Sequence, residues 1–196
     1  MKDFCNFLFS RCYQYQAGLL DEHLVQTALN ETIADVQFHF PQISQSQIIE
    51  KIESNDSELA IFLYRLGRNI LLTIPHSTML KHIHWIMREV CSCEIYFSNQ
   101  IDVGFYLVHG IGTVIGSRNV IGKGFKIYQG CIIGHRLGQS RGVIIGDHVT
   151  VFAHSQILGD IQIGNHVTVD CLSLVIKDVP DKQKCVGIPA RYEAIK

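Results

Sequence analysis

The chain has 196 residues, with 17 lysines and arginines against 18 acidic residues and a net charge of −1. It has no basic stripe, which argues against nucleic-acid binding, and its apolar runs are far shorter than the ~20 residues of a membrane-spanning helix. The seven cysteines are odd in number and irregularly spaced, so we expect free thiols in the reducing cytoplasm. We expect no metal site, because the close pair Cys91 and Cys93 lacks a second pair at zinc-site spacing.

The first half of the chain has the periodicity of helices. Ser44, with Gln47 three residues later, forms a capping-box pattern in front of an apolar stripe. A second stripe runs through residues 58–72, and Pro75 ends the helix that it predicts. We interpret residues 1–93 as a helical cap and assembly domain.

From residue 94 onward a period of six replaces the helical one. Six aliphatic residues follow one another at this spacing, namely Ile145, Val151, Ile157, Ile163, Val169 and Val175. Small or β-branched residues stand four positions after each of the first five, and an earlier run from Ile101 to Cys131 keeps the same spacing less cleanly. Fixed-period repeats of this kind are the signature of a parallel β-helix, in which each coil stacks on the last.

The sequence therefore predicts an α+β fold, with an N-terminal helical region followed by a parallel β-helix of hexapeptide repeats. The β-helix is expected over residues 94–180 and a C-terminal tail over residues 181–196. The two hexapeptide registers are separated near residues 134–142, where we expect one loop to be extruded between coils.

Over about residues 58–191 the chain resembles the serine O-acetyltransferases and, beside them, the acetyltransferases of polysaccharide synthesis. The resemblance lies in the hexapeptide ladder, in Leu107–Gly116 (LVHGIGTVIG) and in Val186–Arg191 (VGIPAR). It implies a left-handed β-helix that binds acetyl-CoA as co-substrate in a groove between neighbouring subunits. It also implies a small-molecule hydroxyl acceptor and a homotrimer, or two trimers joined through the helical caps.

The resemblance further implies a catalytic pair. His109 stands where this family has its general base, and Glu94, fifteen residues earlier, stands where the family has the carboxylate that orients it. A neutral imidazole suits proton removal from a hydroxyl near pH 7, and a carboxylate on the other ring nitrogen fixes the tautomer. We expect direct attack on the thioester without an acyl-enzyme. Ala153 and Cys171 fall on the family's acetyl-CoA surface.

Two departures from the serine acetyltransferase pattern concern the acceptor. Val108 replaces the aspartate before the catalytic histidine, and Gly142 replaces the histidine that follows the loop arginine, here Arg141. The shorter loop carries a different histidine, His135, which we assign with Arg141 to acceptor binding. The acceptor is therefore L-serine, or a sugar hydroxyl of a surface polysaccharide or another small metabolite.

Two further residues are candidates for contact with acetyl-CoA. The backbone near Gly134 can donate to the thioester oxygen, which becomes negative as the hydroxyl attacks, and Arg191 can reach a CoA phosphate. A non-catalytic β-helix scaffold is the alternative class. The missing loop histidine supports it, whereas retention of both His109 and Glu94 opposes it.

Overall fold

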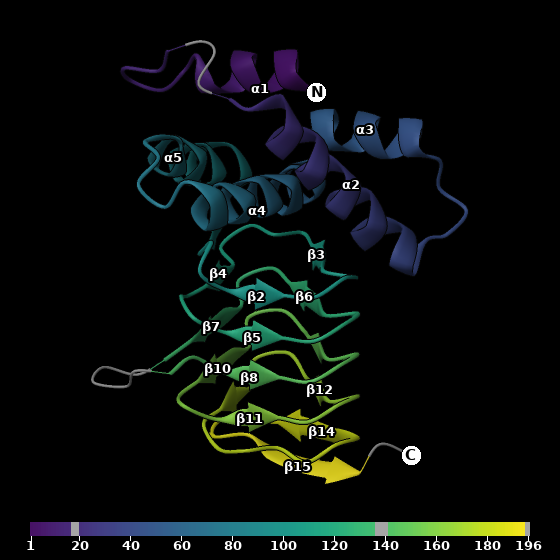
Figure 1. The fold of residues 1–196 in the computed structure, drawn as a ribbon. Helices are drawn as coiled ribbons and strands as arrows, with labels where there is room; N and C mark the ends of the chain where they lie inside the picture. The colour runs from purple at the N-terminus through teal and green to yellow at the C-terminus, as the bar shows by residue number, and fades with distance from the viewer. Residues whose placement is uncertain (17–19, 136–140, 195–196) are drawn as a thin grey trace.

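The computed structural model describes residues 1–16, 20–135 and 141–194. In these residues five helices gather at one end of a stack of β coils (Figure 1). They are α1 (Lys2–Phe9), α2 (Glu22–His39), α3 (Gln45–Ser54), α4 (Asp56–Thr73) and α5 (Met79–Cys91). None of these helices has the length and apolar character that crossing a bilayer requires.

The helix boundaries follow local hydrogen bonding. The predicted capping box is present, because the Ser44 hydroxyl accepts from the Gln47 N–H at 3.4 Å and the Gln47 side chain accepts from the Ser44 N–H at 3.0 Å. Asn55 caps α4 by accepting from the Ser57 N–H at 2.9 Å. Helix α4 ends two residues before Pro75, as expected. It is the central helix, and it packs against α2, α3 and α5.

The strands stack into three sheets, which we call A, B and C. Sheet A contains β1 (Glu94–Ile95), β4 (Val114–Ile115), β7 (Ile132–Gly134), β10 (Gln156–Leu158) and β13 (Leu174–Val175). Sheet B contains β2 (Gln100–Ile101), β5 (Val120–Ile121), β8 (Ile144–Ile145) and β11 (Gln162–Ile163). Sheet C contains β3 (Tyr106–Val108), β6 (Lys126–Tyr128), β9 (Thr150–Val151), β12 (Thr168–Val169), β14 (Gln183–Val186) and β15 (Arg191–Ala194).

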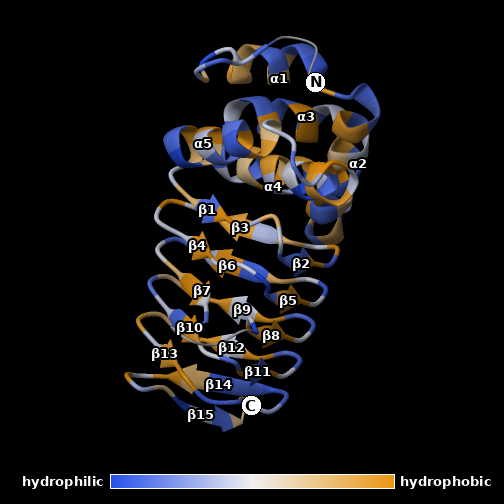
Figure 2. Ribbon diagram, turned by 60° about the vertical axis from the view of Figure 1, so that its left-hand side comes forward, coloured by the Kyte–Doolittle hydropathy of each residue, from blue (hydrophilic) through white to orange (hydrophobic). Residues whose placement is uncertain are grey.

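The chain passes through one strand of each sheet in turn, and the coils wind left-handed, as the resemblance implied (Figure 1). Figure 2 shows hydrophobic colour recurring down the stack, for example at β4, β7 and β13. Both predicted registers point inward, since the aliphatic positions from Ile145 to Val175 and the small or branched positions from Val149 to Ser173 are all buried. The β-helix is therefore stabilised by a continuous apolar ladder.

The earlier run from Ile101 to Cys131 does not follow a single register. Glu94 pairs with Val114, twenty residues on, whereas Val114 pairs with Ile132, eighteen residues on. The first coil therefore has two extra residues, in the corner between β3 and β4. Because of this insertion the run begins at Ile101, an inward residue within β2, and ends at Cys131, an inward residue that directly precedes β7.

Two other irregularities lie farther along the coils. Val120 pairs with Ile144, twenty-four residues on, so the extra residues fall at the loop predicted near residues 134–142. Residues 136–140 of that loop lie outside the described part of the chain. At the other end, β14 pairs in parallel with β12 and carries sheet C past residue 180, and β15 then returns antiparallel to β14.

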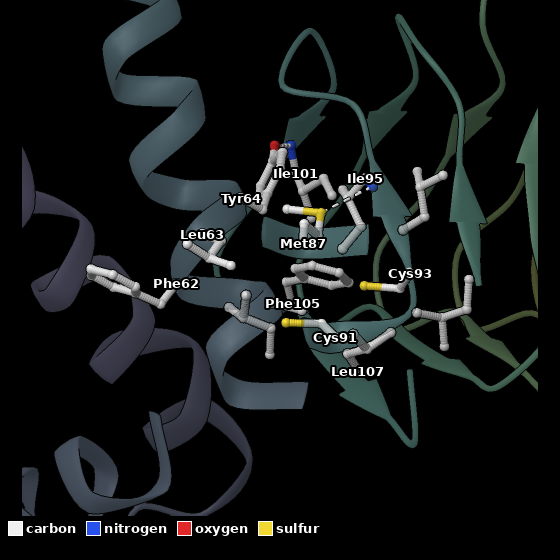
Figure 3. Close-up of a cluster of buried hydrophobic side chains, with 14 of the residues drawn as sticks. Phe62, Leu63, Tyr64, Met87, Cys91, Cys93, Ile95, Ile101, Phe105 and Leu107 are labelled. Carbon is white, nitrogen blue, oxygen red and sulfur yellow. Dashed lines mark hydrogen bonds between the residues drawn. The ribbon is translucent and has the colours of Figure 1, made fainter. Parts of the chain in front are cut away.

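The helices close the top of the β-helix with a mixed apolar and polar contact (Figure 3). The Tyr64 hydroxyl of α4 donates to the Asn99 carbonyl at 3.0 Å and accepts from the Ile101 N–H at 3.2 Å. On α5, the Met87 sulfur accepts from the Ile95 N–H at 3.3 Å. The helical cap thus satisfies backbone groups that the first coil would otherwise leave unpaired.

Candidate active site

The corners between the strands line up into edges of the prism, and one edge carries several predicted site residues. We call the edge where sheet C turns into sheet A the C–A edge. Its corners are joined by backbone hydrogen bonds, including His154 N–H to the Gln129 carbonyl at 2.9 Å and Leu172 N–H to the Ala153 carbonyl at 3.1 Å. His109, Ala153 and Cys171 all lie along it, so the proposed base and the proposed acetyl-CoA surface share one line.

His109 stands in the longest corner of this edge. It follows β3, its side chain is exposed, and its φ of 52° is left-handed. Positive φ recurs at His154 and Leu172 on the same edge, so it reflects the turn of the coil rather than catalysis. The Gly110 N–H donates to the Ser57 hydroxyl at 3.4 Å, which attaches this corner to the first turn of α4.

Glu94 lies at the start of β1, and His109 lies at the end of the same coil. The Glu94 N–H donates to the Thr113 carbonyl at 2.9 Å. Its Oε1 atom is 3.3 Å from Nε2 of His84 on α5. Within the described residues no hydrogen bond joins Glu94 to His109, although the two corners belong to the same edge. A cavity of about 240 Å³ beside Glu94 is lined by Arg88 and by residues of the two corners, among them Cys93 and Gly112.

Burial determines the protonation states of the histidine and the two cysteines near Glu94. Desolvation lowers the pKa of His84, and the Glu94 carboxylate opposes this only partly, so the His84 imidazole is neutral near pH 7. Burial raises the pKa of Cys93 to about 12 and also raises that of Cys91. The two thiols nearest Glu94 are therefore protonated and poor nucleophiles.

The predicted acceptor residues lie on another edge, where sheet A turns into sheet B, which we call the A–B edge. His135 follows β7, and its Nε2 atom is 2.9 Å from a guanidinium nitrogen of Arg118. Arg141 is exposed, and a Cβ placed on Gly134 would meet no heavy atom within 4 Å. Because these residues lie on the A–B edge and His109 lies on the C–A edge, a single chain does not bring them together.

Gly142, at the position where the resemblance implied a loop histidine, is tightly enclosed. A Cβ at this position would lie 2.3 Å from the Arg118 carbonyl oxygen and 2.7 Å from the Asn119 nitrogen. Both atoms belong to the backbone, so no side chain fits here unless the coil moves. The sequence shows the departure, but only the packing explains it.

Arg191 begins β15 and is exposed beside a cavity of about 740 Å³ at the C-terminal end of the stack. Lys177 lines the same cavity. The Leu174 N–H donates to the Gly187 carbonyl at 3.0 Å, which places the segment before Arg191 at the foot of the C–A edge. Arg191 thus lies below Cys171, where a phosphate-bearing ligand on this edge would end, whereas Lys177 follows β13 on the side of the A–B edge.

Sequence reasoning missed His84 and Arg118, since neither belongs to a motif. Across the described ranges no group of three or more histidine, cysteine, aspartate or glutamate side chains is placed to hold a metal ion. His148 and His166 do stack, with ring centroids 5.0 Å apart and planes at 9°, on the third edge of the prism.

Among known proteins, serine acetyltransferases resemble this chain in sequence. It is 36% identical over 115 residues to that of Synechococcus elongatus, a match covering 58% of this chain and 46% of that protein. It is 36% identical over 112 residues to that of Staphylococcus aureus, covering 56% and 52%. The chain therefore spans about half the length of these relatives. No family model matches the chain.

Solved serine acetyltransferases share the fold. The structure from Neisseria gonorrhoeae in complex with serine superposes with a TM-score of 0.79 at 23% identity, covering 98% of this chain and 83% of that one. The structure from Brucella abortus gives a TM-score of 0.71 at 23% identity, covering 88% and 68%. The predicted fold and the predicted resemblance are thus confirmed.

Proposed function

We propose that this relative of the serine acetyltransferases is an acetyl-CoA-dependent O-acetyltransferase, with His109 as general base and Glu94 as the carboxylate that orients it. The observation that carries the proposal is the C–A edge. An exposed histidine in its longest corner is followed down the stack by Ala153 and Cys171 and, at the foot, by Arg191. The edge thus offers an exposed base, a line of stacked corners along which an extended ligand can lie, and a cation at its foot, in the order that an acyl-CoA requires.

In the proposed reaction the acceptor oxygen attacks the thioester carbonyl while the neutral imidazole of His109 takes the hydroxyl proton. Glu94 accepts from the other ring nitrogen and stabilises the imidazolium. The tetrahedral intermediate then expels CoA, whose sulfur receives the proton from His109. A backbone N–H near Gly134 is the proposed donor to the thioester oxygen.

The positions of the two edges favour a site shared between subunits. His135, Arg141 and Gly134 lie one sheet away from His109 within a chain, so a neighbouring copy has to supply them. Three apolar side chains along the C–A edge are strongly exposed, with relative exposures of 60% at Ile111, 63% at Leu172 and 74% at Ile188. A homotrimer that packs the A–B edge of one subunit against the C–A edge of the next covers them.

Subunit mixing tests the shared site. His109→Ala and Arg141→Ala each remove one half of it, so mixed trimers contain some intact sites and recover activity that neither variant has alone. Light scattering gives the mass of the assembly. A monomer that transfers acetyl at the wild-type rate would contradict the arrangement.

L-serine is the proposed acceptor, because the relatives carry that name. A sugar hydroxyl is the second candidate, favoured by the closed backbone at Gly142, which leaves no room for the loop histidine. Release of free CoA from acetyl-CoA, measured with L-serine and with a panel of sugars, separates the two. A protein that binds no CoA and releases none with any acceptor would instead be a scaffold.

A further inference from the structure

We infer that His84 is a positioning residue, which holds the Glu94 carboxylate in the orientation that His109 needs; this rests on the proposed function. The inference starts from a contact outside the family's motifs. His84 Nε2 lies 3.3 Å from Glu94 Oε1, and the two side chains are 24% and 26% exposed. The pair is thus half-buried, where an ionic or hydrogen-bonded contact is less screened than on the open surface.

The His84 ring is held by the strand that carries its partner. Tyr96 meets it edge-on, with ring centroids 5.2 Å apart and planes at 79°, and the Phe97 centroid is 5.5 Å away. Two aromatic neighbours from the segment that follows Glu94 restrict the imidazole to a narrow range of orientations. The nitrogen that faces Glu94 is therefore set by packing rather than by the carboxylate.

The unsatisfied hydrogen-bonding capacity of the His84 ring also indicates Glu94 as its partner. Nε2 of His84 is buried, and within the described residues no hydrogen bond of good geometry satisfies it. Glu94 is the acceptor within reach, and a small rotation of its carboxylate turns the 3.3 Å contact into a hydrogen bond. Because burial keeps His84 neutral, one ring nitrogen carries a proton, and the Nε2–H tautomer donates to Glu94.

The contact between His84 and Glu94 restricts a side chain that is more flexible than the aspartate it replaces. Glutamate has one more rotatable bond than the aspartate that serine acetyltransferases use, so its carboxylate is less restricted. Anchoring Oε1 to His84 leaves Oε2 for the His109 ring on the same edge. Arg88 of α5 is exposed and lines the cavity beside Glu94, and Asp56 at the start of α4 acts electrostatically on the neighbouring Cys93.

The test compares His84→Phe, which keeps an aromatic ring but removes the donor, with His84→Gln, which keeps a donor. We expect His84→Phe to lower kcat by ~10-fold to ~100-fold, the usual effect of a misplaced catalytic group, while KM for acetyl-CoA is unchanged. His84→Gln recovers most of the loss. In a Glu94→Gln background, His84→Phe has no further effect on kcat.

A second readout does not require activity. The ¹⁵N chemical shifts of His109, identified by comparison with His109→Ala, report the tautomer ratio of its ring at one pH. We expect His84→Phe to change this ratio and His84→Gln to preserve it. If no acceptor is acetylated, the proposed function fails and the ¹⁵N shifts still decide the role of His84. Unchanged kcat and an unchanged tautomer ratio in folded His84→Phe would overturn the inference.

Discussion

The ion pair between Arg65 and Asp35 connects the helical cap to the first coil, and its removal has a cost that the structure allows us to estimate. Arg65 of α4 donates from Nε and Nη2 to the two Asp35 oxygens, each at 2.8 Å. It also donates to the Ile101 carbonyl at 2.7 Å. Asp35 of α2 in turn accepts from the Gly104 N–H at 2.8 Å. Both side chains are buried.

Arg65→Met fills much of the same space but leaves the Asp35 carboxylate buried without a cation. Breaking a buried pair in this way costs ~3–5 kcal/mol. For a protein of this length each kcal/mol shifts Tm by about 2–4 °C, so we expect Tm to fall by about 6–20 °C. Differential scanning calorimetry at pH 7 measures the change.

Lys184→Met is the matched control, because Lys184 pairs with Asp170 at a similar distance of 3.0 Å but on the surface. Its expected cost is within about 1 kcal/mol. Adding Asp35→Leu to Arg65→Met removes the stranded charge and restores part of the stability. If Arg65→Met shifts Tm no more than Lys184→Met does, the reasoning about this pair is wrong.

Three further results are expected. Gly142→Ala destabilises the protein by ~1–3 kcal/mol in urea unfolding, because the new Cβ overlaps the backbone of Arg118. Gly134→Ala changes stability by less than about 0.5 kcal/mol, because its Cβ has no heavy atom within 4 Å. Equal effects of the two substitutions would refute this. In the native protein iodoacetamide alkylates Cys171 first, because it is the exposed thiol, and bound acetyl-CoA slows this alkylation. If acetyl-CoA gives no protection, Cys171 does not belong to the acetyl-CoA surface. Burial lowers the pKa of His39 and His84 in the folded state, so their contribution to stability is present above the unfolded pKa of about 6.5 and is lost as pH falls below it. Urea unfolding between pH 7 and pH 5 therefore shows a falling free energy of unfolding, and the fall with pH is shallower in His39→Gln. An equal pH dependence in the variant and the wild type would contradict this.

The β-helix could be predicted because each inward position imposes the same demand. Ile157 stacks on Val175 in one sheet and Val169 on Val151 in another, so the sequence repeats what the packing repeats. The capping box at Ser44 was likewise predictable, since both of its hydrogen bonds lie within four residues. Features that depend on neighbours along the chain leave a pattern there.

The rest depends on contacts between distant segments. The two extra residues near His109 cannot be recognised in the sequence, because Thr113 also falls inward after the insertion and the spacing of six continues across it. The contact of His84 with Glu94 joins a helix to a strand and follows no period. The closed position at Gly142 depends on backbone from the previous coil.

The most direct test of the central claim is detection of the acetylated acceptor by mass spectrometry. Purified protein is incubated with acetyl-CoA and L-serine, and His109→Ala is compared with His166→Ala, which removes another exposed histidine from a left-handed corner. The account predicts O-acetylserine from wild type and from His166→Ala, and a yield at least ~100-fold lower from His109→Ala. Equal yields from both variants would contradict a general base at His109.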